Sequence, residues 1–425
     1  MKLLNKELNI CVVGLGYVGL PLSLAFSEKY SVIGFDLNLE RINSLLDFRD
    51  ITNESDKLLL TKSINNGSFV LTNKEEDIKN ADIFIVTVPT PIDSQKEPDL
   101  SPLEYASEII GKSLKEGDIV VYESTVFPGA TEEICIPILE KYSGLRFNKD
   151  FFCGYSPERI NPGDKERSLT DIKKIVSGSN EEATKFLTNL YSTIIKAGIY
   201  QASSIRVAEA AKIIENVQRD VNIGLVNELA MLFNKLDINT EEVLEAASSK
   251  WNFLNFKPGL VGGHCIGIDP YYLTHKANSV GIDTKIVLSS RQVNDRMGRY
   301  VASHFVKQYK SSTKYNERAK ILILGFAFKD DCPDHRNTRV IDIFRELSDF
   351  GFDTQIHDPL VNAQEVFKEY AVKINKESIK NILKDFDAIL LAVSHKEYKD
   401  IHCDLKDNAF VYDVKSFLEY SDATL

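Results

Sequence analysis

A glycine-rich turn between two apolar segments constrains the fold of this chain more than any other feature. Residues 8–14 read LNICVVG, a short run rich in β-branched side chains that is typical of a buried strand. The motif GLGYVG follows at 14–19, and a helical stretch, LPLSLAFSEK, continues from it. A second apolar segment, SVIGFD, then ends in Asp36. This order of strand, glycine turn, helix and strand predicts a dinucleotide-binding unit of the Rossmann type.

The chemistry of a dinucleotide explains why these residue types stand at these positions. Gly14 allows the tight turn, Gly16 lets the backbone approach a pyrophosphate, and Gly19 lets the helix pack closely on the strand. The helix N-terminus offers unpaired N–H groups to the phosphates. Asp36 suits the ribose hydroxyls and repels a 2′-phosphate, so the sequence predicts NAD rather than NADP. We also predict cofactor contacts at Tyr17, Val18, Arg41, Pro89, Thr90 and Thr125.

Further segments continue the alternation of strands and helices. Strands are predicted at 82–89, 118–125 and 151–158, with helices near 102–114 and 131–142. Polar residues at 123–125 and 156–158 follow two of these strands, where ligands of parallel sheets bind. Such residues can simply stop a strand or cap a turn. Several polar strand ends on one edge nevertheless favour a ligand cleft.

The α/β pattern returns near the C-terminus. Residues 319–328 read as a strand and glycine turn, 338–351 as a helix, and the next strand ends in Asp358. The loop before this helix carries Lys329 and Arg336. A charged loop is usually only solvated surface, but cations before a helix N-terminus also suit a second phosphate ligand. The sequence therefore predicts a second nucleotide-binding domain.

A long helix is predicted in the middle of the chain. From Arg206 to about Leu236 there is no proline and one glycine, enough for a helix of roughly 45 Å at 1.5 Å per residue. Lys212 and Asn216 share one face of it, with Arg219 beside them. A polar stripe is usually the solvated side of a helix. The abundant Ala, Ile, Val and Leu predict burial instead, and buried polar groups need partners in the protein or in a substrate.

Composition excludes several classes of protein. A net charge of −11 without a long basic run argues against nucleic acid or an anionic membrane as partner. No two cysteines have CxxC spacing and no HExxH motif occurs, so we predict a reduced, metal-free cytoplasmic protein. The apolar run 10–26 imitates a signal peptide, but it contains three glycines and Pro21, and no small-residue cleavage site follows.

With these features in place, the chain resembles the UDP-glucose/GDP-mannose dehydrogenase family. The motifs that carry the resemblance are VVGLGYVGLP (12–21), SPERINPGD (156–164), AEAAKIIEN (208–216), PGLVGGHCIGIDPYYLTHKA (258–277) and GFAFKDD (325–331). The resemblance implies an α/β fold with two Rossmann-like doubly wound domains, joined by a long central helix and a helical dimerisation domain. The implied domains are an NAD-binding domain at 1–200, a central helical domain at 201–310 and a UDP-sugar-binding domain at 311–425.

The family's reaction gives Cys265 a role. Members of the family oxidise the C6 hydroxymethyl group of a nucleotide sugar to a carboxylate, with two NAD per turnover. Cys265 matches the nucleophile, whose thiolate traps the intermediate aldehyde as a thiohemiacetal that is then oxidised to a thioester. Taken alone, the stretch around Cys265 favours a small buried thiol in a glycine turn.

The resemblance also implies roles for other residues. Glu158 and Thr125 would position or activate the hydrolytic water. Lys212 would stabilise the developing oxyanion, and Asn216 and Asp269 would orient the substrate and the water. The predicted substrate contacts are Glu158, Arg159, Lys212, Asn216, Arg219, Lys257, Gly262, Lys329 and Arg336.

The stretch FKPGLVGGHCIGIDPYYLTHKA is similar to the branch that oxidises UDP-N-acetylhexosamines for surface polysaccharides such as capsule and O-antigen. We therefore predict a UDP-N-acetylglucosamine or UDP-N-acetylgalactosamine 6-dehydrogenase. Alternatives are a UDP-glucose 6-dehydrogenase, a simple two-electron NAD dehydrogenase, and a non-catalytic nucleotide-binding regulatory protein that would need no nucleophile. The expected assembly is a homodimer, with Lys250 and Lys257 as candidates for a contact that crosses it.

Overall fold

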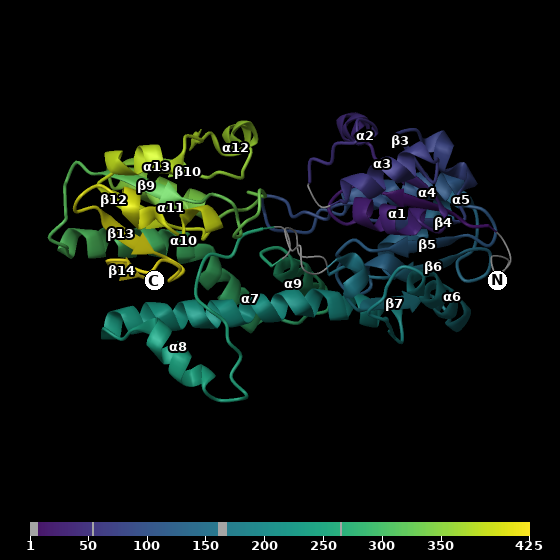
Figure 1. The fold of residues 1–425 in the computed structure, drawn as a ribbon. Coiled ribbons are helices and arrows are strands. Elements are labelled where there is room, and N and C mark those ends of the chain that lie inside the picture. The colour runs from purple at the N-terminus through teal and green to yellow at the C-terminus, as the bar shows by residue number, and fades with distance from the viewer. Residues whose placement is uncertain (1–6, 53–54, 160–167, 264–265) are drawn as a thin grey trace. The chain divides into compact units, whose positions relative to one another are not determined.

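In a computed structural model, the chain folds into two compact units. The structure describes residues 7–52, 55–159, 168–263 and 266–425. Unit 1 consists of Met1–Glu215 and Tyr271–Gly281, and unit 2 consists of Asn216–Pro270 and Ile282–Leu425. Figure 1 shows the elements of both units, coloured along the chain. Among the described residues, no helix combines the length and the apolar character that crossing a membrane requires.

A sheet of eight described strands, in the order β3-β2-β1-β4-β5-β6-β7-β8, forms the centre of unit 1. Its strands are β1 (Asn9–Val13), β2 (Ser31–Phe35), β3 (Phe69–Thr72), β4 (Ile83–Val86), β5 (Ile119–Tyr122), β6 (Phe152–Tyr155), β7 (Lys174–Gly178) and β8 (Ile199–Gln201). The strands pair in parallel except where β7 runs antiparallel to β6. This reversal brings the first residue of β7 to the edge of the sheet where β5 and β6 end.

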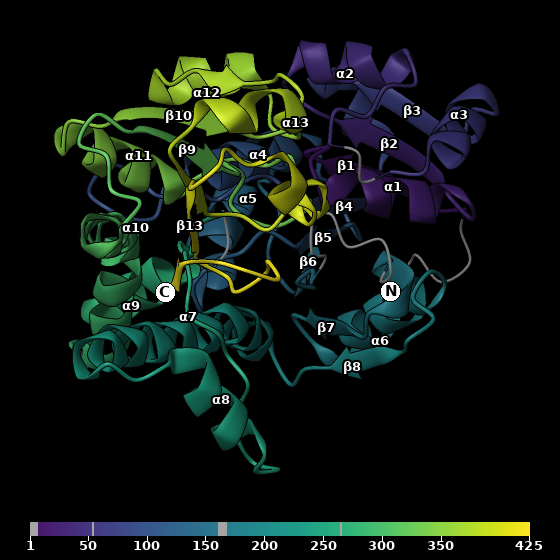
Figure 2. The same cartoon turned by 60° about the vertical axis from the view of Figure 1, so that its left-hand side comes forward.

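Helices cover both faces of this sheet. They are α1 (Gly19–Ser27), α2 (Leu39–Leu46), α3 (Lys57–Asn65), α4 (Ser101–Ser113), α5 (Ile136–Ser143) and α6 (Glu181–Ser192). Ile10 and Val12 of β1 belong to a core that also contains side chains of α1, α3 and α6. Because successive side chains of a strand point to opposite faces, Cys11 and Val13 are buried on the other side. Figure 2 shows α6 beside β7 and β8.

The predicted central helix is confirmed as α7 (Ile205–Leu236), and the boundary between the units falls within it, after Glu215. Three more helices follow it, α8 (Thr240–Ser248), α9 (Asp269–Ser279) and α10 (Lys285–Ser311). Asn227 of α7 binds both backbone groups of Gly259 at 2.8 and 3.0 Å, and its Nδ2 also donates to Asn294 of α10 at 2.8 Å. These buried amides fix the chain that leads toward Cys265.

Unit 2 contains a parallel sheet of six described strands, in the order β11-β10-β9-β12-β13-β14. The strands are β9 (Lys320–Leu324), β10 (Asp353–His357), β11 (Ile374–Asn375), β12 (Ala388–Leu391), β13 (Phe410–Asp413) and β14 (Ala423–Thr424). The helices after β9 are α11 (Val340–Asp349), α12 (Ala363–Tyr370) and α13 (Ile379–Ile382).

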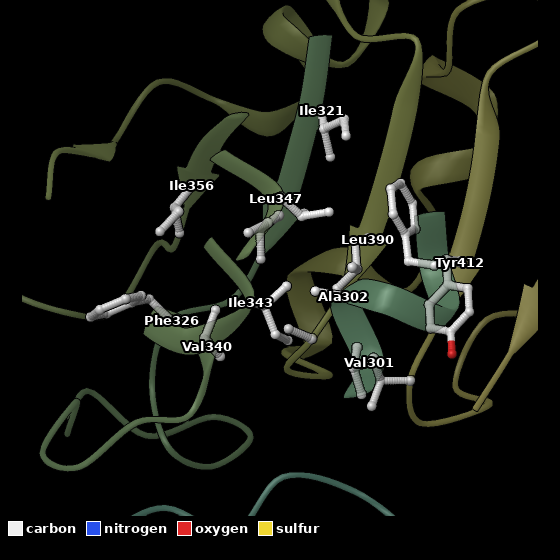
Figure 3. Close-up of a cluster of buried hydrophobic side chains, with 14 of the residues drawn as sticks. Val301, Ala302, Ile321, Phe326, Val340, Ile343, Leu347, Ile356, Leu390 and Tyr412 are labelled. Atoms are coloured by element: carbon white, nitrogen blue, oxygen red, sulfur yellow. The ribbon is translucent and has the colours of Figure 1, made fainter. Parts of the chain in front are cut away.

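The core of unit 2 has two layers. Ile321 of β9 belongs to one buried cluster with Val301 and Ala302 of α10 and with Leu347 of α11, and Figure 3 labels these side chains. The alternate residues of β9 face the other side, where Leu322 joins a second cluster beneath α13. The predicted α/β fold, with two Rossmann-like parallel sheets and a long central helix, is therefore confirmed.

Candidate active site

The glycine turn after β1 has the close packing that a dinucleotide site requires. Gly14 has a φ of +94°, a conformation that favours glycine, and its N–H donates to Phe35 O at 2.8 Å. Thr87 Oγ1 donates to Gly14 O at 2.6 Å. A Cβ added at Gly19 would lie 1.9 Å from Gly14 O, so α1 approaches β1 as closely as backbone allows.

The same turn leaves room for a ligand. Gly16 is exposed, and a Cβ added there would meet nothing within 4 Å in the described chain. The first turn of α1, next to the half-buried Tyr17 and Val18, carries no acidic residue and no described side chain caps it. No acid of that first turn therefore offsets the positive end of the helix dipole, which suits an anion. Asp36 Oδ2 accepts from Leu15 N at 2.8 Å, which places its carboxylate beside the turn. These residues fit NAD.

The other predicted cofactor residues differ in exposure. Arg41 is buried beneath the turn, where its Nε donates to Leu15 O at 2.9 Å and its Nη1 lies 2.9 Å from Asp50 Oδ1. Thr90 is buried, Pro89 is exposed and Thr125 is half-buried. Arg41 thus supports the glycine turn from below.

Three buried charged side chains meet at the carboxyl ends of β5 and β6. Lys174 Nζ lies 2.5 Å from Glu158 Oε2 and 2.6 Å from Glu123 Oε2. Arg159 N donates to Glu158 Oε1 at 2.7 Å, and the Tyr191 hydroxyl donates to Glu123 Oε1. Both oxygens of Glu158 therefore accept hydrogen bonds. The sequence predicted a role for Glu158 and placed Glu123 among the polar strand ends that favour a ligand cleft, but it did not mark Lys174, because a lysine before an apolar strand reads as a surface residue.

Burial and the attraction between Lys174 and the two glutamates determine the pKa shifts in this cluster. Burial raises the pKa of Glu123, and the neighbouring ammonium of Lys174 opposes that effect. Burial acts to lower the pKa of Lys174, but the two carboxylates outweigh it and raise that pKa. Lys174 is therefore held as an ammonium ion between two acids.

Two of the three polar residues predicted to form the site on α7 are buried. Asn216 Nδ2 donates to Asp269 Oδ2 at 2.6 Å, and both side chains are buried. Asn216 Oδ1 is also buried and accepts no hydrogen bond from the described residues. Lys212 is buried one turn earlier, on the same face of α7, while Arg219 is half-buried. The amide of Asn216 thus has a fixed orientation and an acceptor left for a further polar group.

Cys265 and His264 lie outside the described residues. Gly263 immediately before them has a φ of +83°, and its N–H donates to Arg336 O at 3.1 Å. A Cβ added at Gly262 would lie 2.9 Å from Asn337 O. The chain that leads to the predicted nucleophile is therefore packed against the charged loop that follows β9.

Two of the predicted cations, Arg336 and Lys257, pair with acidic side chains. Arg336 forms a bidentate pair with the buried Asp334, at 3.0 Å from Nε to Oδ1 and 2.6 Å from Nη2 to Oδ2. Lys329 is half-buried in the same loop. Lys257 is exposed and pairs with Glu241 of α8 at 2.6 Å. Asp334 therefore fixes the direction of the Arg336 guanidinium.

The acid at the end of the second strand of unit 2 has a different environment from Asp36. Asp358 is fully buried, and its Oδ2 accepts from Phe326 N at 2.6 Å, Ala327 N at 2.9 Å and His395 Nε2 at 3.1 Å. Burial acts to raise the pKa of Asp358, but His395 and the backbone donors hold it below its usual range. Asp358 thus holds the turn and leaves no open carboxylate for a ribose.

The predicted site residues fall into two groups. Unit 1 contains Thr125, Glu158, Arg159 and Lys212, together with the cofactor residues. Unit 2 contains Asn216, Arg219, Lys257, Gly262, Asp269, Lys329 and Arg336. The described residues contain no cluster of acidic, histidine or cysteine side chains that suits a metal ion, and the five described cysteines are free thiols.

Comparison with known proteins places this architecture in a family. Residues 8–195 match the NAD binding domain of the UDP-glucose/GDP-mannose dehydrogenase family, 206–296 match its central domain and 322–420 its UDP binding domain. The predicted cofactor NAD and the second nucleotide domain are thereby confirmed.

Full-length relatives and a solved structure agree with these matches. The chain is 52% identical over 425 residues to the UDP-N-acetyl-D-glucosamine 6-dehydrogenase of Pseudomonas aeruginosa, with 99% of both chains covered. It is 50% identical over 416 residues to Protein CapL of Staphylococcus aureus, with 96% of both chains covered. The structure of a UDP-D-ManNAc dehydrogenase from Pyrococcus horikoshii superimposes with a TM-score of 0.85 at 29% identity, covering 97% of each chain. With its nucleotide turn, its central helix and its second nucleotide domain, the chain belongs to the UDP-glucose/GDP-mannose dehydrogenase family.

Proposed function

We propose that this protein is an NAD-dependent 6-dehydrogenase of UDP-N-acetylhexosamines, with UDP-N-acetyl-D-glucosamine as its preferred substrate. The observation that carries the proposal is the 52% identity, over 425 residues, to a protein named for that activity. The open glycine turn beside Asp36 and the cationic loop after β9 support it, because they suit a dinucleotide and a nucleoside diphosphate.

The reaction converts a primary alcohol into a carboxylate in two oxidations. When bound, NAD supplies the acceptor for each of the two hydrides that leave C6. In our proposal the Cys265 thiolate adds to the aldehyde carbon, forming a thiohemiacetal whose oxidation leaves a thioester. Water then attacks the thioester, the C–S bond breaks, and the acid departs as the thiol is restored.

Four described side chains are proposed to serve these steps. Glu158 directs the attacking water and takes up its proton, since both of its oxygens already accept hydrogen bonds as a carboxylate does. Lys212 stabilises the negative charge that develops on the C6 oxygen. Asn216, held by Asp269, orients the reacting groups through its remaining acceptor.

The uridine diphosphate is proposed to bind the loop after β9. Lys329 and Arg336 supply positive charge there, and the bidentate pair with Asp334 fixes the Arg336 guanidinium before a ligand arrives. The N-terminus of α11 follows this loop and adds its own positive dipole end.

A substrate panel tests the activity directly. Purified protein is given NAD with UDP-N-acetylglucosamine, UDP-N-acetylgalactosamine or UDP-glucose, and NADH absorbance and uronic acid are measured. We expect the highest kcat/KM with UDP-N-acetylglucosamine and two NADH for each uronic acid. A higher kcat/KM with UDP-glucose than with both acetamido sugars would support the UDP-glucose 6-dehydrogenase alternative. Tight nucleotide binding without any NADH would support the regulatory alternative.

We further propose a cytoplasmic homodimer that serves the synthesis of a surface polysaccharide. Exposed apolar side chains on the central helices support the dimer. Leu225, Leu232 and Leu236 repeat along one face of α7, and Trp251 after α8 is 97% exposed. Exposed apolar surface of this kind is typical of protein interfaces.

A further inference from the structure

We infer that Lys174 is a positioning residue for Glu158: it keeps the Glu158 carboxylate ionised and fixed in direction at the end of β6. The inference rests on the proposed role of Glu158 in thioester hydrolysis. Lys174 belongs to none of the sequence motifs described above. All of its contacts used below lie within unit 1.

Strand register explains why these two side chains meet. In the antiparallel pair of β6 and β7, Gly154 lies opposite Gly178 and Tyr155 opposite Ser177. The same register, continued past the last paired residues, sets Glu158 opposite Lys174. The hydrogen bond from Ser156 Oγ to Ile175 O, at 2.8 Å, shows that the two chains stay together beyond the ladder.

The parallel pair of β5 and β6 brings the second acid to the same place. Tyr122 lies opposite Tyr155 in that pair, so Glu123 follows at the same edge of the sheet. The ammonium of Lys174 then lies between two carboxylates, at 2.5 and 2.6 Å. Glu123, Glu158 and Lys174 are 4, 7 and 3% exposed, so water screens none of these charges well.

The surrounding charges make Lys174 decisive for the ionisation of Glu158. Tyr191 of α6 faces the cluster and donates to Glu123, and Arg159 turns its guanidinium to Glu215 of α7, at 2.8 Å. Among the residues that the structure describes, Lys174 is therefore the cation seen to contact both acids. Without it, two buried carboxylates would face each other, and their repulsion would favour protonation of one of them. A protonated Glu158 cannot accept a proton from water.

Stability alone does not require this arrangement. Buried ion pairs contribute little net stability compared with apolar side chains of the same volume, because burial removes the charges from water. The cluster does give Glu158 a defined direction, since Lys174 holds Oε2 and the backbone N–H of Arg159 holds Oε1 at 2.7 Å. A general base that must meet one water molecule benefits from that restriction.

The test compares the pH profiles of kcat for a set of full-length variants, with NAD and the UDP-sugar both saturating. In Lys174→Met we expect a kcat at pH 7 that is at least tenfold lower, with the acidic limb at higher pH by one unit or more. Both KM values should stay within twofold of the unmodified enzyme. Lys174→Arg should restore the position of the limb, because it restores the cation.

Two further variants address the charge balance and protect the test from misfolding. Glu123→Gln leaves the ammonium facing Glu158 alone, so the acidic limb should move to lower pH. The double variant Lys174→Met/Glu123→Gln removes the repelling acid as well, so its limb should return toward that of the unmodified enzyme. Circular dichroism checks that each variant is folded. If Lys174→Met does not fold, the pH profile of Glu123→Gln alone decides the test.

The outcomes separate the inference from the proposed function. If Glu158→Gln keeps near-normal production of uronic acid, the role proposed for Glu158 is wrong and the inference fails with it. If Glu158→Gln abolishes turnover while folded Lys174→Met keeps the pH profile of the unmodified enzyme, the inference alone is overturned. An acidic limb that Glu123→Gln leaves in place would overturn it too.

Discussion

At the scale of single residues, two glycines of the same motif face opposite surroundings. A methyl group at Gly19 would collide with Gly14 O at 1.9 Å, whereas one at Gly16 would meet open space. We predict that Gly16→Ala folds normally but raises KM for NAD roughly tenfold, or about 1.4 kcal/mol, because the methyl group takes the place of the approaching pyrophosphate. Steady-state kinetics and thermal unfolding measure the two effects.

Gly19→Ala is the matched control for this prediction. It adds the same methyl group and should lower the melting temperature, because α1 must move away from β1. A Gly16→Ala enzyme with an unchanged KM for NAD would contradict the placement of the pyrophosphate over this turn.

Cys265 gives the second prediction at this scale. Cys265→Ala should stop the production of uronic acid while leaving the fold and the affinities for NAD and UDP intact, because the covalent intermediate can no longer form. Cys265→Ser should stall as an ester or turn over far more slowly, since an ester hydrolyses less readily than a thioester. The measurement is acid production over time, with mass spectrometry to detect an adduct.

Cys11→Ala serves as the matched control, because that thiol is fully buried in β1 and burial raises its pKa far above the usual range. The Cys11→Ala enzyme should be somewhat less stable but should still produce uronic acid. A folded Cys265→Ala enzyme that makes acid at a near-normal rate would return Cys265 to the role of a thiol in a glycine turn.

At the scale of secondary-structure elements, the loop between β9 and α11 carries the third prediction. Arg336→Ala should raise KM for the UDP-sugar roughly tenfold and leave KM for NAD within twofold, because it removes a preoriented guanidinium from the diphosphate. Asp334→Asn should raise the same KM by a smaller factor, since the cation remains but loses its bidentate partner. An Arg336→Ala enzyme that loses affinity for NAD instead would contradict the assignment of the UDP-sugar to this loop.

The contact between α7 and α10 gives a prediction about pH. Asp220 of α7 accepts from Arg291 and, at 2.8 Å, from Asn294, while its Oδ2 is buried and has no partner among the described residues. Burial raises the pKa of Asp220 to about 6, and Arg291 opposes it. Because the folded-state pKa lies above the unfolded value of about 3.9, the stabilisation is complete below that value and is lost as the pH rises through 6.

The comparison with Asp220→Asn isolates this effect from other titrations. The free energy of unfolding of the unmodified protein, minus that of Asp220→Asn, should be larger at pH 5 than at pH 7.5 by about 1.4 kcal/mol. Urea unfolding at the two pH values measures it. A difference that stays constant, or grows with pH, would show that Asp220 is fully ionised in the folded protein.

Local sequence signals predicted some elements well because those elements depend on local rules. The turn at 14–19 and the helix α7 follow from glycine placement and from the absence of proline over some thirty residues. The meeting of Lys174 with Glu158 depends on β7 reversing its direction, and no local residue pattern encodes that reversal. The burial of Asp358 likewise depends on His395, which is close only after the sheet has formed.

At the scale of the whole molecule, the proposed dimer gives the last prediction. Leu232→Glu places a charge among the exposed apolar residues of α7 and should shift the protein toward monomer, because burying an unpaired carboxylate is costly. Leu58→Glu on α3, where the native side chain is also exposed, is the control and should leave the mass unchanged. Light scattering after size-exclusion chromatography reports both. Equal masses for the two variants would exclude this face of α7 as the interface.

The two aspartates that end the second strand of each unit hold equivalent places in two similar folds. Each accepts a hydrogen bond from the glycine turn, but Asp36 is only half-buried, whereas Asp358 is fully buried and enclosed by His395. Attempts to redesign coenzyme preference in this protein should therefore change Asp36 and spare Asp358. In other proteins with two such domains, an acidic residue at the end of the second strand therefore indicates the structure of the glycine turn. It indicates which coenzyme binds only where the fold leaves the carboxylate accessible.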